Sequence, residues 1–206
     1  MVHDMSLGLL EAKASPLLAP PRLHSRVDVL TRPSPIPAAA GVYAWYFNEI
    51  PPSVPIDGCR VVDGHTLLYV GISPKKPSAD GLRASRQTMR TRVSYHYRGN
   101  AYGSTLRLSL GSVLAAELAI QLRRVGSGTR LTFSTGEEAL SDWMSRHARV
   151  CWLETAEPWV LEEELIHHLV LPLNLDQNTR SSFRKELSEA RGLQRTRARS
   201  LPVLPR

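Results

Sequence analysis

The chain has 206 residues, 42% of them hydrophobic, and this length can bury a core as one domain with extensions. The formal net charge is +7, because 26 lysines and arginines, mostly arginine, outnumber 19 acidic residues. Arginine suits phosphate, so this balance favours a polyanionic partner, although an ordinary basic protein can carry the same charge.

Cysteine usage and hydropathy indicate the compartment. The two cysteines, Cys59 and Cys151, form no CxxC pair, so neither a zinc site nor a disulfide scaffold is indicated and a reducing cytoplasm fits. Charges at Asp4, Glu11 and Lys13 interrupt the N-terminal apolar residues, and no run approaches the roughly 20 apolar residues of a membrane span. We therefore expect a cytoplasmic protein without a membrane partner.

Proline is frequent in residues 1–40. Its density prevents long regular elements, so we expect an arm that joins the core, with short helices near 7–14 and 26–30. Two apolar runs follow: GVYAWYF at 41–47 reads as a strand, and LLYVGIS at 67–73 reads as a central strand. One polar loop joins them, with room for a short strand at 60–62, so an antiparallel pair is the simplest topology.

A helix is predicted over 82–97, because Leu82, Met89, Val93 and Tyr97 fall on one stripe at helical spacing. Arg92 and His96, four residues apart, lie together on its flank and can point into one cleft. Thr135 with Glu138 predicts a capping box, and Thr155 predicts an N-cap. The later elements are a largely helical segment over 106–125, a strand over 131–134, a helix over 135–147, a strand over 149–154, and helices over 155–170 and 179–191.

Glu162 falls in the middle of the buried face that Leu161, Leu165, Ile166 and Leu169 form on the helix over 155–170. A carboxylate there is costly unless a cation meets it, so the position requires a metal, an arginine, or both. A structural salt bridge with Arg92 would produce the same pattern. The neighbouring Glu163, Glu164, His167 and His168 lie outside the apolar arc, which argues against a histidine metal site.

Five features occur in order: a G-x-Y strand at 41–43, a Y-x-G strand at 69–71, Arg92 with His96, the inward Glu162, and Asn174 twelve residues later. Together they resemble the GIY-YIG nuclease family. The likeness covers 41–178, with insertions at 48–66 and 98–148. The arm over 1–40, and the C-terminal helix and basic tail over 179–206, lie outside it, and we expect the tail to be mobile.

The resemblance implies an α/β fold of the α+β type, with a small central antiparallel sheet of about three strands flanked by helices. It also implies hydrolysis of phosphodiesters with one divalent metal, usually Mg²⁺, in place of which another ion such as Mn²⁺ can act. By this likeness Glu162 holds the metal, Arg92 grips the scissile phosphate, and Tyr43 is the general base or positions the water. Tyr69 and His96 assist in proton transfer or phosphate contact.

The remaining expected site residues surround these. Gly71 and Asn174 shape the cleft, and Arg90 and Arg98 contact the substrate. We predict a metal-dependent endonuclease acting on DNA. The alternatives are a non-cleaving nucleic-acid binding module on the same fold, and a structural protein whose basic tail binds acidic surfaces.

The sequence contains no obvious module for recognising a nucleic-acid target. No helix-turn-helix or zinc finger occurs in the sequence, so the arm, the insertions, the tail or a targeting partner protein must recognise the substrate. DNA against RNA, the biological pathway and the oligomeric state stay open.

Overall fold

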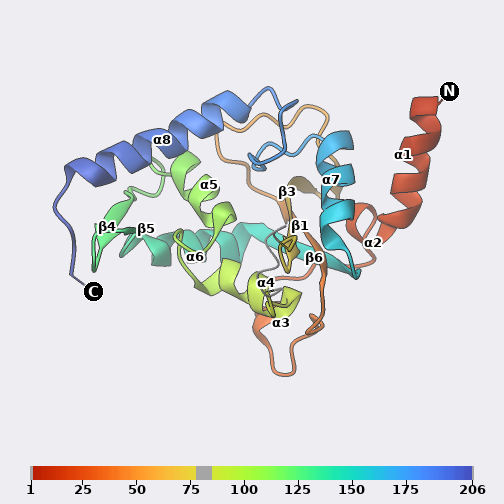
Figure 1. Cartoon of the computed structure of the whole chain (residues 1–206), viewed down its shortest axis with the longest axis horizontal. Coiled ribbons are helices and arrows are strands. Elements are labelled where there is room, and N and C mark those ends of the chain that lie inside the picture. The colour runs from red at the N-terminus through yellow and green to blue at the C-terminus, as the bar shows by residue number, and fades with distance from the viewer. Residues whose placement is uncertain (1, 78–84, 206) are drawn as a thin grey trace.

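The main sheet is antiparallel, and its strands follow the spatial order β2-β3-β1-β6 in a computed structural model that describes residues 2–77 and 85–205. Its strands are β1 (Gly41–Phe47), β2 (Val61–Val62), β3 (His65–Ser73) and β6 (Ala148–Glu154). Helices flank this sheet on both sides (Figure 1). The predicted α/β class, with a small antiparallel sheet between helices, is confirmed, and the two-residue β2 is the fourth strand.

The centre of the sheet is β1, between β3 and β6, and every residue of it is buried. The predicted antiparallel pairing with β3 is confirmed, and its register sets Tyr43 opposite Gly71. The segment 67–73, predicted as a central strand, lies within β3, which occupies an interior position of the sheet between β2 and β1. Only His65 and Thr66 of β3 pair with β2, so the rest of this edge of β3 has no neighbouring strand.

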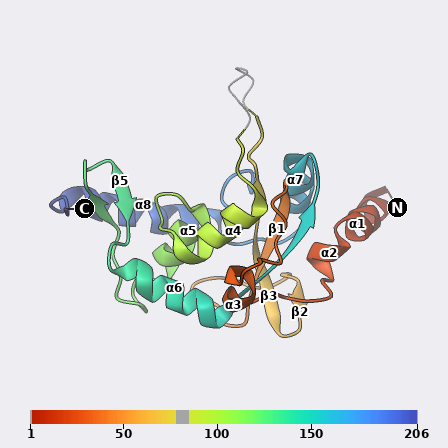
Figure 2. The same cartoon turned by 90° about the horizontal axis from the view of Figure 1, so that it is seen from below.

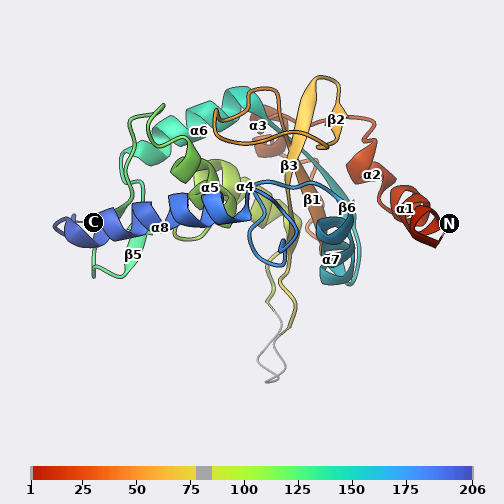
Figure 3. The same cartoon turned by 90° about the horizontal axis from the view of Figure 1, so that it is seen from above.

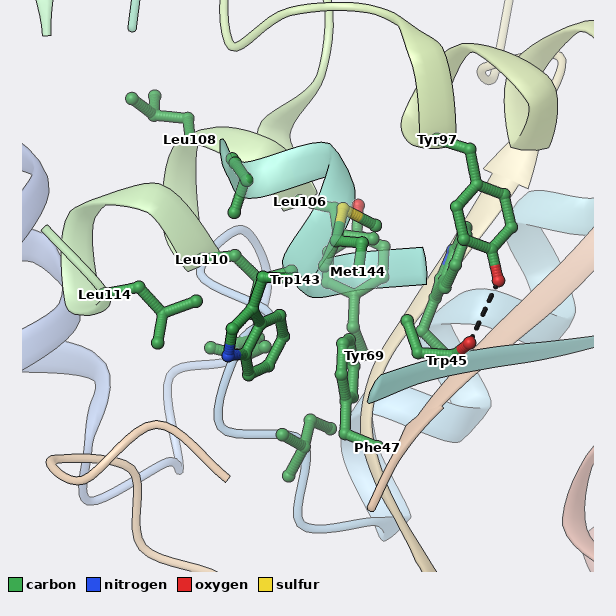
Figure 4. Packing of buried hydrophobic residues seen from close by; sticks show 14 of the residues in the cluster. Trp45, Phe47, Tyr69, Tyr97, Leu106, Leu108, Leu110, Leu114, Trp143 and Met144 are labelled. Atoms are coloured by element: carbon green, nitrogen blue, oxygen red, sulfur yellow. Dashed lines mark hydrogen bonds between the residues drawn. The ribbon is translucent and has the colours of Figure 1, made fainter. Parts of the chain in front are cut away.

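One side of the sheet packs against helices α4 (Met89–Arg98), α5 (Thr105–Val113) and α6 (Gly136–His147). Alternate residues of β1, including Trp45 and Phe47, point to this side. Trp45 meets the ring of Tyr97 edge-on with centroids 4.8 Å apart, and Phe47 lies against Trp143 (Figure 4). The Tyr97 hydroxyl donates to the carbonyl of Ala148 at 3.1 Å, which ties α4 to β6.

The other side packs against α7 (Pro158–His168), α1 (Val2–Lys13) and α2 (Ser15–Leu18), as Figure 2 shows. The N-terminal segment passes the outer edge of β6, where His24 and Val150 exchange two backbone hydrogen bonds of 2.9 Å. It continues into α3 (Arg26–Leu30), which packs on the side of α4 and α6. The predicted helix over 26–30 is confirmed. The N-terminal arm over 1–40 contributes buried residues to the hydrophobic clusters on both sides of the sheet.

Several helix boundaries differ from the expectation. The helix predicted over 106–125 ends at Val113, and the chain turns into a small second sheet of β4 (Arg123–Val125) and β5 (Arg130–Thr132). The helix predicted from Leu82 begins at Met89, behind a capping box of Thr88 and Thr91, whereas Leu82 itself lies outside the described residues.

The predicted caps were wrong. The side chain of Thr135 makes no cap hydrogen bond, and α7 begins at Pro158 behind Glu157, three residues after Thr155. Glu137, the neighbour of the expected box residue, is used instead as an acceptor for the backbone N–H groups of Ala101 and Phe133.

The C-terminal segment is ordered, which corrects the predicted mobile tail. Helix α8 (Arg184–Ser200) packs on α5 and buries Leu187, Arg191, Gln194 and Ala198 along one face. Beyond it Leu204 exchanges backbone hydrogen bonds with Arg124 and Gly126. The many arginines of this segment hid a buried stripe at helical spacing. None of the helices in the described ranges is long and apolar enough to cross a membrane.

Candidate active site

A cavity of about 650 Å³ opens where β1, β3, α4, α7 and the segment after α7 meet. It brings together residues that are far apart in the sequence. The predicted site residues that line it are Tyr43, Tyr69, Gly71, Arg92, Glu162 and Asn174. His96, Arg90 and Arg98 do not line it.

Tyr43 lies across the strand pair from Gly71, and the two positions depend on each other. A Cβ atom added at Gly71 would lie 2.7 Å from the Tyr43 hydroxyl oxygen and 2.9 Å from the ring. Only glycine leaves room for this ring. Gly41, at the start of the same motif, is similarly enclosed by the Leu153 carbonyl and the side chain of Met89. Close packing therefore explains why both tripeptides have glycine, and no larger residue, at Gly41 and Gly71.

A buried hydrogen-bond chain extends behind Tyr43. Its hydroxyl lies 2.9 Å from Nε2 of His96, and Nδ1 of His96 lies 2.7 Å from the hydroxyl of Ser104. Ser104 is also the N-cap of α5, because its oxygen accepts from the backbone N–H of Arg107. His96 is fully buried, so it reaches the cavity only through Tyr43.

Burial controls the protonation of this chain. It raises the pKa of Tyr43 far above the usual 10, nearby Tyr69 adds to the effect, and Arg92 acts against it. Burial also lowers the pKa of His96 well below 6.5, and the charges of Arg92 and Arg107 lower it further. Tyr43 is therefore a neutral phenol and His96 a neutral imidazole at pH 7 in this state.

Arg92 connects the cavity to the loop between α4 and α5. Its Nη1 donates to the carbonyl of Gly103 at 2.6 Å, and its guanidinium lines the cavity near Tyr43. Tyr69 is the next phenol along, and its hydroxyl lies 3.1 Å from the Thr105 hydroxyl at the start of α5. The inserted segment therefore positions two of the cavity's side chains.

Glu162 is a half-buried carboxylate on α7. Among the residues that the structure describes, it has no hydrogen-bond or ion-pair partner, and Arg92 is not paired with it. Burial raises its pKa from 4.5 to about 7, Lys75 opposes the shift, and Asp176 adds to it. A carboxylate in this position favours a cation in the cavity.

Asn174 closes the free edge of β3. Its Oδ1 accepts from the N–H of Val70 and its Nδ2 donates to the carbonyl of the same residue, both at 2.9 Å. The buried side chain replaces a neighbouring strand and fixes the segment after α7 beside the cavity.

Arg90 and Arg98 line a second pocket of about 610 Å³ together with Arg32. This pocket lies between the segment after α3 and the opposite face of α4. Nε of Arg90 donates to the carbonyl of Ile36 at 2.7 Å.

Sequence reasoning missed four features around the cavity. Behind His96 the fully buried Arg107 pairs with Glu137 and donates to the His96 carbonyl. The long sequence separation of this pair left no local signal. Lys75, Asp176 and Arg191 line the cavity itself. For Arg191 a signal did exist, since it continues a stripe with Leu187, Gln194 and Ala198.

Comparison with known proteins fits this geometry. The family model described as the GIY-YIG catalytic domain matches residues 41–193, about three quarters of the chain. The chain belongs to the GIY-YIG nuclease family. The match to the GIY-YIG domain passes the expected boundary at 178 and includes half of α8. No curated protein and no solved structure matches the chain.

GIY-YIG nucleases generally use a divalent metal ion, and the residues here fit one. No cluster of three His, Cys, Asp or Glu side chains occurs among the described residues. Of the carboxylates that line the cavity, Glu163 and Asp176 are exposed and Glu162 is half-buried, so Glu162 is the candidate ligand. Mg²⁺ typically takes one or two protein carboxylates and keeps most of its waters. A cation beside Glu162 would also offset the cost of burying its charge.

Proposed function

We propose that this GIY-YIG domain is a metal-dependent endonuclease that hydrolyses phosphodiester bonds in DNA. One observation carries the proposal: the unpartnered carboxylate of Glu162, the Arg92 guanidinium and the Tyr43 phenol line one cavity. Phosphodiester hydrolysis needs a place for a cation, a cationic grip on the phosphate, and a group that handles the water.

Glu162 holds Mg²⁺, or Mn²⁺ in its place. The bound ion supplies Lewis acidity at the phosphate and lowers the pKa of a bound water. Arg92 binds the scissile phosphate, and its bond to the Gly103 carbonyl keeps the guanidinium aimed while other N–H groups stay available. Arg92 then stabilises the charge that develops in the transition state.

Tyr43 orients the attacking water through its phenol oxygen. The neutral His96 fixes that oxygen and does not store a proton, because imidazolium would be buried near two arginines. Deprotonation of Tyr43 needs additional positive charge close by, since burial outweighs the effect of Arg92. Tyr69 contacts the phosphate or assists proton transfer, and Gly71 and Asn174 maintain the shape of the cavity.

Arg90, Arg98 and Arg32 contact the backbone of the same substrate outside the cavity. No acidic residue lines their pocket among the described residues, and Arg32 and Arg98 have no acidic partner there. Such a patch attracts phosphates without reading sequence.

Cleavage of plasmid and branched DNA tests the proposal, with Mg²⁺ or EDTA and with wild type and Glu162→Gln. Glu164→Gln is the matched control, because it makes the same change on α7 where the carboxylate pairs with exposed Lys13. We expect Mg²⁺-dependent cutting by the wild type and the control alone. Equal cutting by Glu162→Gln would refute the assigned role, and binding without cutting by all three would favour the non-cleaving module. Labelled RNA in parallel tests the choice of DNA.

A further inference from the structure

Arg191 lies on the buried face of α8, with only 7% of its surface exposed. Leu187, Gln194 and Ala198 share this face, at spacings that bring them to one side of the helix. Gln194 fixes the orientation, since its Oε1 accepts from the backbone N–H of Leu122 at 3.0 Å. The helix is therefore held so that an arginine points inward.

The Arg191 guanidinium lacks an acceptor. Its Nε is buried without a hydrogen-bond partner, and it has no ion-pair partner among the residues that the structure describes. Arg107, by contrast, is fully buried, pairs with Glu137 and donates to the carbonyls of His96 and Glu137. An unpaired buried charge is costly, so a position like that of Arg191 indicates that an anion arrives from outside.

The side chain opens into the candidate active site. Arg191 lines the same cavity as Glu162 and Arg92. Its electrostatic neighbours are Arg195, Asp176 and Tyr69, whereas Arg92 interacts first with Tyr43. Both arginines therefore interact with Tyr69, and only Arg92 of the two also interacts with Tyr43. Figure 3 shows α8 leading away from the main sheet, with its N-terminal end nearest to that sheet.

We propose that Arg191 binds a second phosphate of the nucleic-acid backbone, next to the scissile phosphate that Arg92 binds. This inference rests on the proposed function, which makes a nucleic-acid backbone, with a phosphodiester at every nucleotide, the ligand of the cavity. A phosphate presents two oxygens that match the guanidinium fork, so it satisfies the buried Nε as well as the charge. The C-terminal helix is then part of the substrate-binding site.

DNA binding in EDTA tests this without cleavage. We compare fluorescence anisotropy of a labelled duplex with wild type, Arg191→Gln and Arg197→Gln. Arg197 is exposed on the same helix and controls for loss of one positive charge. Arg191→Gln should raise Kd roughly tenfold or more. It should also reduce the slope of log Kd against log salt by about one, whereas the control changes neither appreciably. Equal effects of the two variants would overturn the proposal.

Stability supplies a second readout. Because Arg191→Gln removes an unpartnered buried charge, its Tm in phosphate-free buffer should equal or exceed that of the wild type. Added inorganic phosphate should raise the Tm of the wild type more than that of Arg191→Gln. A large drop in Tm for Arg191→Gln would mean that the guanidinium holds the fold together, and would contradict a substrate role.

The two proposals fail differently. Wild type that binds DNA through Arg191 but never cuts with Mg²⁺ would refute the nuclease and keep the phosphate site. Mg²⁺-dependent cutting with unchanged DNA affinity and salt slope in Arg191→Gln would keep the nuclease and refute the phosphate site.

Discussion

Replacing Glu162 with glutamine should remove cleavage and, without metal, stabilise the folded protein above neutral pH. The variant keeps the size of the side chain and removes its charge. In the wild type, the half-buried carboxylate has no hydrogen-bond or ion-pair partner among the described residues, and Lys75 only partly offsets the cost of ionising it. A structural salt bridge at this position would give the opposite sign.

The size follows from the pKa. Burial raises the pKa of Glu162 from 4.5 to about 7, and each unit corresponds to about 1.4 kcal/mol. A raised carboxyl pKa favours the folded state most below the unfolded value, and this contribution is lost as the pH rises through about 7. The wild type should therefore lose up to about 3 kcal/mol relative to Glu162→Gln between pH 4.5 and 7. Above pH 7 the difference stays constant.

Calorimetry in EDTA at pH 5 and pH 8 measures this difference. For a chain of this length, about 3 kcal/mol corresponds to a Tm shift of roughly 5–10 °C. We expect nearly equal Tm values at pH 5 and a higher Tm for Glu162→Gln at pH 8. Glu164→Gln should show no such pH-dependent gain. A variant that is less stable than the wild type at both pH values would refute the reasoning and make Glu162 a structural residue.

The remaining predictions concern packing, the buried ion pair and the metal. Gly71→Ala puts Cβ 2.7 Å from the Tyr43 oxygen, so we expect loss of most cleavage and about 1–3 kcal/mol in urea unfolding. Gly8→Ala, with open space around it, is the control and should lose neither. Glu137→Gln leaves the buried Arg107 without its counter-charge and should cost about 3–5 kcal/mol in urea unfolding; a loss below about 1 kcal/mol would contradict this. With limiting Mg²⁺, cleavage should rise with pH up to about 7 and then level, because protons compete for the α7 carboxylate; a flat profile over pH 5–7 would argue against that ligand.

The part of the fold that local pattern controls was predictable. The aromatic and branched residues of 41–47 and 67–73 strongly favour strands, and the single polar loop between them favours the antiparallel pair that the structure contains. The cavity residues were predictable for a related reason, because Glu162 interrupts an apolar helical face and such an interruption is visible in the sequence. The two tripeptides then indicated the family resemblance, which implied the remaining site residues.

Tertiary contacts decided the rest. Leu118 and Leu122 suggested a continued helix, but they pack against the core from a turning segment that α8 holds through the Leu122 N–H. The sequence also could not show that two different faces of α4 each line a pocket. Arg92 enters the cavity, whereas Arg90 and Arg98 lie on the other side, above a pocket made with the N-terminal arm.

The insertion over 98–148 belongs to the site for a physical reason. The first turn of α5 contributes Ser104 and Thr105, which contact His96 and Tyr69 and so hold side chains from two other elements in place. Those contacts depend on the position of α5, and the Arg107–Glu137 ion pair fixes α5 to α6.

Helix α8 supports α5 from its other side and carries Arg191 into the same cavity. A substrate phosphate bound at Arg191 would therefore press on the element that also positions Tyr69. Binding at this end of the cavity and alignment at the Tyr43 end are then coupled through one helix. The family match continues past Asn174 to residue 193, so the matched range includes Arg191 and the wall that it contributes to the cavity.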